Sequence, residues 1–176
     1  MRIHLITPIV TEGIRTLDDV ADLNSADLSI TQSLIASGPV SIESEFDEAM
    51  SVPGIVAEAI AAERSGADAL IIDCMGDPGL NAAREVVSIP VLGPSETSMH
   101  IAAMLGHKYS VVTVLDSVVP MIENLAQIYG TSKKLASVRV INIPVLELEA
   151  APEKLIAELA KASVAAVEDD GAHAIV

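Results

Sequence analysis

Short runs of β-branched and aliphatic residues alternate with longer helical patterns along the whole chain. The runs predict strands at about 2–8, 27–31, 69–73, 90–93, 109–115, 138–143 and 173–176. Residues 69–72 and 111–115 are continuously apolar, or nearly so, as is typical of interior strands buried on both faces. Strands that alternate with helices indicate an α/β protein built on a mostly parallel sheet.

The helical segments have recognisable boundaries. Pro53 is predicted to open a helix with apolar residues at helical spacing, and Gly66 to end it in the left-handed conformation. Residues 152 to 171 repeat this pattern. Helices are also expected at about 78–87, 95–105 and 117–130, and residues 95–98 are expected to cap the helix after Pro94. The segment 17–24 fits either a helix or a loop.

The two ends of the chain share a pattern. One constant shift along the sequence places Ala57, Ala61, Glu63, Gly66, Ala67 and Ala69 on Ala162, Ala166, Glu168, Gly171, Ala172 and Ala174. A shift longer by a single position places 5–7 on 111–113. Any helix followed by a glycine and a strand looks similar, but the agreement of the two shifts favours two related halves. We expect these halves to span 1–97 and 98–176.

The repeat also predicts where the second half stops. The counterpart of Cys74 would fall just beyond Val176, the last residue of the sequence. A chain that ends inside an apolar central strand would leave backbone groups unpaired. We therefore expect the sequence to be a shortened version of a longer protein.

Composition excludes several classes of protein. The chain has 176 residues, of which 51% are hydrophobic, so it can bury a substantial core and is not disordered. Its net charge of −15 makes nucleic acid and anionic membranes poor partners. Without a run of about 18 apolar residues or a signal peptide, it is expected to be soluble and cytoplasmic.

The single cysteine, Cys74, is the main candidate for chemistry. It follows the apolar run 69–73, at the strand end where ligands of parallel sheets bind. If Asp77 caps a helix that starts at Pro78, the thiol lies near the positive end of a helix dipole, which would lower its pKa. Asp73 would oppose this effect. The alternative is a cysteine that only packs in the core.

Other residues at the same strand ends could contact a ligand. Thr7 and Thr113 occupy matching positions in the repeat, although threonine is also simply a good strand former. Ser41 lies in a loop, 38–43, that precedes a helix. The four histidines have no metal-ligand spacing, so no metal is predicted. A phosphate-accepting receiver domain and a dinucleotide site both lack their further motifs.

Several motifs resemble those of the Asp/Glu/hydantoin racemase superfamily, and the hydantoin racemase branch in particular. The most specific is Cys74-Met75-Gly76-Asp77-Pro78-Gly79-Leu80, with Ala83-Arg84-Glu85 after it. The loop 38–43, the segments 90–93 and 111–113 and the stretch 171–176 add to the resemblance, which covers most of the chain. The family usually has Asn-Pro-Asn after the first strand, whereas this chain has Thr7-Pro8-Ile9.

The resemblance implies a fold and a mechanism. The fold is two pseudo-symmetric α/β halves with an active site between them, each a mostly parallel sheet flanked by helices. One cysteine from each half moves the α-proton of the substrate without a cofactor. Cys74 would be the first, and the second would lie in a Gly-Cys-x-Gly-Met element just after Val176. A homo-oligomer is also implied.

We therefore predict a cofactor-independent racemase or epimerase acting on a 5-substituted hydantoin or related amino-acid derivative. Cys74 is the predicted catalytic residue, and the predicted substrate-binding residues are Thr7, Pro8, Ser41, Ile42, Met75, Gly76 and Thr113. The alternatives are a decarboxylase or cis–trans isomerase of the same superfamily, and a non-catalytic binder of small molecules.

Overall fold

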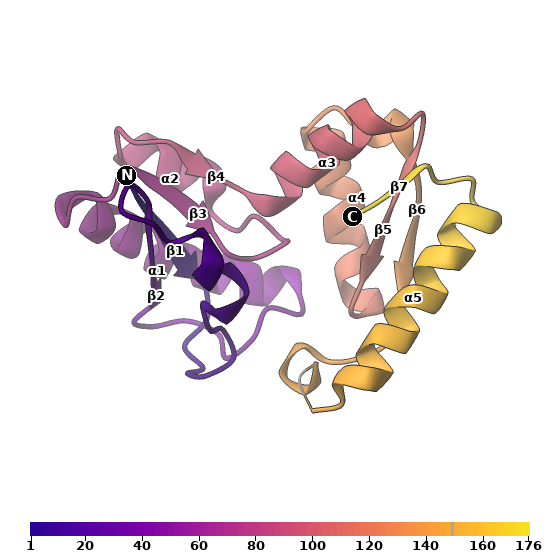
Figure 1. Ribbon diagram of the computed structural model, residues 1–176, viewed down its shortest axis with the longest axis horizontal. Coiled ribbons are helices and arrows are strands. Elements are labelled where there is room, and N and C mark those ends of the chain that lie inside the picture. Colours follow the sequence, from indigo (N-terminus) through magenta and orange to yellow (C-terminus); the bar gives the residue numbers. More distant parts are fainter. Residues whose placement is uncertain (149) are drawn as a thin grey trace. The chain divides into compact units, whose positions relative to one another are not determined.

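The computed structural model describes residues 1–148 and 150–176, which form two compact units, Met1–Pro94 and Ser95–Val176. Figure 1 shows their strands and helices. The strands are β1 (Arg2–Thr7), β2 (Ser29–Leu34), β3 (Ala69–Ile72), β4 (Val91–Leu92), β5 (Tyr109–Thr113), β6 (Leu135–Val140) and β7 (Ala174–Ile175). The α-helices are α1 (Glu45–Arg64), α2 (Leu80–Val86), α3 (Pro94–Leu105), α4 (Val119–Ile128) and α5 (Pro152–Glu168). Short 3-10 helices are η1 (Asp18–Leu23), η2 (Asp116–Val118), η3 (Ser132–Lys134) and η4 (Val145–Glu147).

The first unit is built on a wholly parallel sheet with the strand order β2-β1-β3-β4. Side chains alternate between the two faces of each strand, and Ile6, Leu70 and Ile72 pack in one buried core with residues of α1 and α2. Ile55 and Ala59 are the contributions of α1 to this core. The predicted parallel α/β architecture is therefore confirmed.

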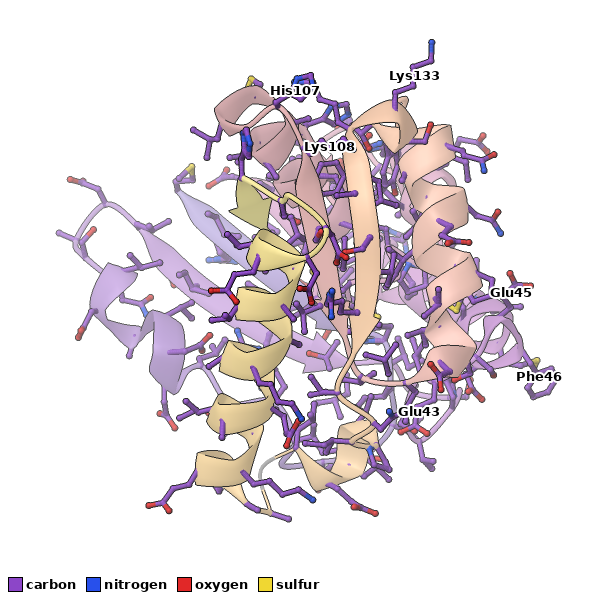
Figure 2. All side chains as sticks on the ribbon, turned by 90° about the vertical axis from the view of Figure 1, so that its right-hand side faces the viewer. Glu43, Glu45, Phe46, His107, Lys108 and Lys133 are labelled. Atoms are coloured by element: carbon purple, nitrogen blue, oxygen red, sulfur yellow. The ribbon has the colours of Figure 1, made fainter. Side chains whose placement is uncertain are left out.

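The second unit has a parallel sheet with the order β6-β5-β7. Tyr109 and Val111 of β5 pack with α3 and α4, including the buried side chains Met99 and Met121. The parallel register puts the amino ends of β5 and β6 at one edge, where Figure 2 labels Lys108 just before β5 and Lys133 in η3.

The two units repeat one topology. In each, the first strand in sequence is an interior strand of its sheet, flanked by the second strand and by the strand that follows a long helix. The shifts that align the sequence repeat also place β2 on β6 from end to end and the start of β3 on the start of β7. The cross-strand pair His4 and Thr31, whose side chains hydrogen-bond at 2.8 Å, falls on Ser110 and Ser137, which also hydrogen-bond at 2.8 Å.

Some predicted boundaries are wrong. The helix expected to open at Pro53 begins at Glu45, with the Ser44 hydroxyl accepting from the Asp47 N–H, so Pro53 lies inside α1. The helix after Pro94 includes that proline, so residues 95–98 form its first turn rather than its cap. The strand expected at about 138–143 is β6, which begins and ends earlier. The segment 17–24, left open between helix and loop, contains η1.

Among the described residues, no helix is both long enough and apolar enough to cross a bilayer. The most exposed apolar side chains include single residues such as Phe46, which lies in the first turn of α1 and points away from the ribbon in Figure 2.

Candidate active site in the first unit

The carboxyl ends of β1 and β3 meet at one edge of the first sheet. Ile6 pairs with Ile72, and the Asp73 N–H donates to the Ile6 carbonyl at 2.9 Å. Thr7 and Cys74 therefore leave neighbouring strands at the same edge. Ligands of open parallel sheets bind at such an edge because the loops there converge.

The loop after β2 is tied to the same edge. The Val10 N–H donates to the Pro39 carbonyl at 3.0 Å, and the Thr11 hydroxyl donates to the Val40 carbonyl at 2.7 Å. These bonds hold the segment containing Ser41 and Ile42 against the segment that follows Thr7 and Pro8. The structure thus brings together, at one edge, the segments that carry six of the predicted binding residues: Thr7, Pro8, Ser41, Ile42, Met75 and Gly76.

Thr113, the remaining predicted binding residue, belongs to the second unit. It ends β5, the strand equivalent to β1, so it occupies the place that Thr7 has in the first unit.

Cys74 lies in a tight turn directly after β3. Its carbonyl accepts from the Asp77 N–H at 3.0 Å, and its sulfur accepts from the Gly76 N–H at 3.5 Å. Asp77 has a φ of 49°, and α2 begins only at Leu80, with Gly79 (φ 65°) as its N-cap. The prediction that Asp77 caps a helix starting at Pro78 is therefore wrong.

The local electrostatics favour the protonated thiol. Burial, together with the nearby carboxylates of Glu48, Asp77 and Asp73, raises the pKa of Cys74 from 9.0 to about 12, although the Gly76 N–H opposes the shift. From the sequence we predicted a lowered pKa for this thiol, because a helix end was expected next to the sulfur. Instead, a turn follows Cys74, and α2 begins only at Leu80.

Glu48 connects α1 to this site. Burial and the charges of Glu45 and Asp77 raise its pKa from 4.5 to about 6. Its main-chain N–H donates to the Ser44 carbonyl in the first turn of α1, so its position depends on where that helix begins. The sequence prediction missed Glu48 because it placed residues 44–52 outside the helix.

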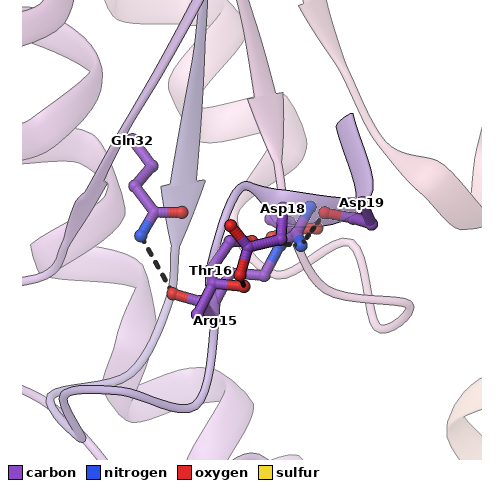
Figure 3. A network of polar contacts seen from close by, with 6 residues as sticks. Arg15, Thr16, Asp18, Asp19 and Gln32 are labelled. Carbon is purple, nitrogen blue, oxygen red and sulfur yellow. Dashed lines mark hydrogen bonds and ion pairs between the residues drawn. The ribbon is translucent and has the colours of Figure 1, made fainter. Parts of the chain in front are cut away.

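A cation faces Asp73 from the segment between β1 and η1. The Arg15 guanidinium donates from Nε to Oδ2 of Asp73 at 2.6 Å and from Nη1 to Oδ1 of Asp19 at 2.5 Å. Figure 3 shows this network, in which the Gln32 side chain also donates to the Arg15 carbonyl at 3.0 Å. Arg15 is not among the residues predicted from the sequence, although it is a lone cation among Glu12, Asp18, Asp19 and Asp22.

The Thr7 hydroxyl is buried without a hydrogen-bond partner among the described residues. A buried hydroxyl left unpaired costs about 1–3 kcal/mol, so such groups are usually satisfied by protein, water or ligand. Within the same residues, no cluster of histidine, cysteine and carboxylate side chains is arranged to hold a metal ion.

Comparison with known proteins places the chain in a known family. Residues 11–176 match the family model described as Asp/Glu/Hydantoin racemase. A hydantoin racemase of Pseudomonas sp. (strain NS671) is 42% identical over 99% of this chain and 71% of its own length. A hydantoin racemase of Rhizobium meliloti is 40% identical over 100% of this chain and 74% of its own length.

A solved structure agrees with these sequence matches. The allantoin racemase from Klebsiella pneumoniae superposes with a TM-score of 0.89 and 33% identity, over 99% of this chain and 72% of that chain. The family model covers far more than half of the chain, and both hydantoin racemases match it nearly from end to end. The chain therefore belongs to the Asp/Glu/hydantoin racemase family and is an isomerase of the racemase type.

Proposed function

We propose that this racemase acts on 5-substituted hydantoins, including the ureido-substituted hydantoin allantoin, and that Cys74 exchanges a proton with C5 of the ring. The observation that supports this most is the position of Cys74. The thiol lies at the carboxyl edge of the sheet, in a turn next to the end of β1, where the buried Thr7 hydroxyl has no partner among the described residues. The names of the relatives support the choice of substrate class.

The proposed reaction needs no cofactor. A base takes the proton from C5, and the electron pair of the broken C–H bond moves into the adjacent C4 carbonyl to give an enolate. A thiol then returns a proton to C5 from the opposite face, and the electron pair forms the new C–H bond. Proton transfer by positioned groups and hydrogen bonds to the enolate oxygen lower the barrier.

Cys74 starts this cycle as the proton donor. Its raised pKa means that the thiol is protonated near neutral pH, as a group that delivers a proton to the enolate must be. After donating, the thiolate accepts the C5 proton of the other enantiomer. The opposing base in this proposal is a second cysteine, as the resemblance to the family implies.

Thr7 is the proposed contact to the ring. Its hydroxyl can donate to a ring carbonyl or accept from a ring N–H, and either bond would satisfy the oxygen that the described residues leave unpaired. The Gly76 N–H, now on the Cys74 sulfur at 3.5 Å, strengthens its bond as that sulfur becomes a thiolate. Both groups therefore lie where charge and hydrogen bonding change during the reaction.

The direct test starts from one enantiomer of 5-isopropylhydantoin. Loss of optical rotation is followed, the uncatalysed rate is subtracted, and entry of deuterium at C5 in D₂O is read by NMR. Cys74→Ala and Cys74→Ser are expected to lower the rate by about two to four orders of magnitude. Lys133→Ala, an exposed substitution in η3 (Figure 2), is the matched control and is expected to keep the activity.

Two outcomes contradict the proposal. If Cys74→Ala racemises the hydantoin at the unsubstituted rate, Cys74 is not the acid or base. If the protein binds the ring but brings no deuterium to C5, it is not acting as a hydantoin racemase. An arylmalonate and maleate are tested in parallel, so that decarboxylation or cis–trans isomerisation would be recognised by its product.

A further inference from the structure

Arg15 is held by hydrogen bonds to four residues. Its guanidinium donates to Asp73 and Asp19, and Nη1 also donates to the Thr16 carbonyl at 2.5 Å. Its own carbonyl accepts from Gln32 of β2 (Figure 3). About a quarter of the Arg15 and Asp73 side chains is exposed to solvent, so this ion pair is less screened than one on the open surface.

Asp73 lies directly after the end of β3. It is the residue before Cys74, and its N–H completes the ladder between β3 and β1. Glu48 comes from α1 and Asp77 from the turn after Cys74. Carboxylates from three segments of the chain therefore raise the pKa of the Cys74 thiol. Of these, Asp73 has the smallest effect on the thiol, and it is the carboxylate that Arg15 contacts.

We propose that Arg15 is a positioning residue that pairs with Asp73 and thereby weakens the opposition of this carboxylate, directly before Cys74, to loss of the thiol proton. This inference rests on the proposed role of Cys74 as a proton carrier. It adds that the segment between β1 and η1, distant from Cys74 in sequence, sets how readily the thiol ionises. Arg15 acts through Asp73 and the substrate does not have to touch it.

If the ion pair between Arg15 and Asp73 is only structural, the substitutions are expected to have different effects. If Arg15 only pins the segment after β1 to β3, each single substitution lowers the melting temperature and leaves the chemistry of the sulfur unchanged. If Arg15 compensates charge, removing it exposes the sulfur to an unpaired carboxylate. Removing the Asp73 charge as well then restores the reactivity of the Cys74 thiol, even though the ion pair is still absent.

The experiment measures the rate at which iodoacetamide alkylates Cys74, read from the mass of the peptide that contains this residue. Because the thiol pKa is near 12, only a small fraction is thiolate at about pH 9, and the rate follows that fraction. The variants are Arg15→Gln, Asp73→Asn and the double substitution. Arg64→Gln removes the same charge from an exposed site at the end of α1, and serves as the control.

Arg15→Gln is expected to slow alkylation about three- to tenfold, because the gain in nucleophilicity of a more basic thiolate offsets part of the pKa shift. The double substitution is expected to return to within about twofold of the unsubstituted rate. Arg64→Gln is expected to leave the rate unchanged. The melting temperature of each variant is recorded, so that a loosened fold, which would speed alkylation rather than slow it, is recognised.

The proposal is overturned if Arg15→Gln alkylates as fast as the unsubstituted protein, or if the double substitution stays as slow as Arg15→Gln. Neither result depends on turnover of a hydantoin. Failure of the proposed function would instead appear as racemisation that survives Cys74→Ala, whatever the alkylation rates are.

Discussion

At the scale of single residues, Glu48 holds a carboxyl group where its ionised form is disfavoured. The folded protein raises the pKa of Glu48 to about 6, so between about pH 4.5 and pH 6 the folded state binds more protons at this site than the unfolded chain does. The site therefore favours folding at low pH. That contribution is lost as the pH rises through about 6.

The substitution Glu48→Gln tests whether the ionised Glu48 carboxylate destabilises the folded protein. The substitution keeps the size of the side chain and removes the charge, so at about pH 7.5 we expect a gain of about 1 kcal/mol in the free energy of unfolding, after allowing for solvent screening. At about pH 4 the gain should disappear, since both side chains are then neutral. Urea unfolding at the two pH values measures the difference.

The control is Glu123→Gln, at an exposed position of α4. It removes the same charge from the surface, so its effect should be small and similar at both pH values. A gain for Glu48→Gln that is equally large at about pH 4 would contradict the explanation. As Glu48 is also the strongest charge on Cys74, the substitution should speed alkylation of the thiol.

At the scale of elements, α1 packs unusually closely against the end of β2. A Cβ atom added to Gly54 would lie 2.7 Å from the Cβ of Ile35 and 3.0 Å from the Ser37 carbonyl oxygen. These are positions on the backbone or next to it, so they cannot move aside cheaply. The close approach brings the amino-terminal half of α1, and with it Glu48, to the edge of the sheet.

Gly54→Ala should therefore destabilise the protein, by about 1–3 kcal/mol. Helix propensity alone predicts the opposite, a gain of about 1 kcal/mol. Ala57→Gly, at an exposed position of the same helix, is the paired variant and should cost about 1 kcal/mol through propensity. Thermal or urea unfolding decides the sign, and a stabilised Gly54→Ala variant would show that α1 has room to shift.

The pattern of residues predicted the strands better than the helix ends. Runs such as Ala69–Ile72 are short and aliphatic, so their place in a parallel sheet followed from local sequence. The start of α1 was also encoded locally, because Ser44 and Asp47 form a reciprocal cap, with the Ser44 hydroxyl donating to the Asp47 carboxylate at 2.7 Å. Pro53 concealed it, since proline more often opens a helix than lies inside one.

The candidate site depended on contacts that local sequence does not contain. The carboxylate of Asp77 occupies the space that a side chain at Gly93 would fill, since an added Cβ would lie 2.5 Å from it. Only glycine at position 93 leaves room for the buried Asp77, whose N–H donates to the Cys74 carbonyl across the turn. Cys74 and Thr7 could be identified because each lies at the end of a predicted strand. Glu48 and Arg15 could not, because they are distant from Cys74 in sequence and only the fold brings their charges to the site.

At the scale of the whole molecule, a net charge of −15 on 176 residues opposes compaction. We expect the melting temperature to rise by about 2–5 °C when NaCl is increased from about 0.01 M to about 0.3 M, because the screening length falls from about 30 Å to less than about 10 Å. Differential scanning calorimetry measures this, and KCl at matched ionic strength should have the same effect. A melting temperature that stays constant or falls would contradict it.

The position of the first strand of each sheet also has a consequence for synthesis. Ile3 of β1 pairs with Ile30 on one side and, on the other, with Ala69, which is made only after the whole of α1. In the second sheet, Tyr109 of β5 pairs with Ala174, which is likewise made only after α5. At about 5–20 residues per second, each strand spends about 3–13 s on the ribosome before its last neighbour exists. Each half thus passes through an interval in which an interior strand has an unpaired edge.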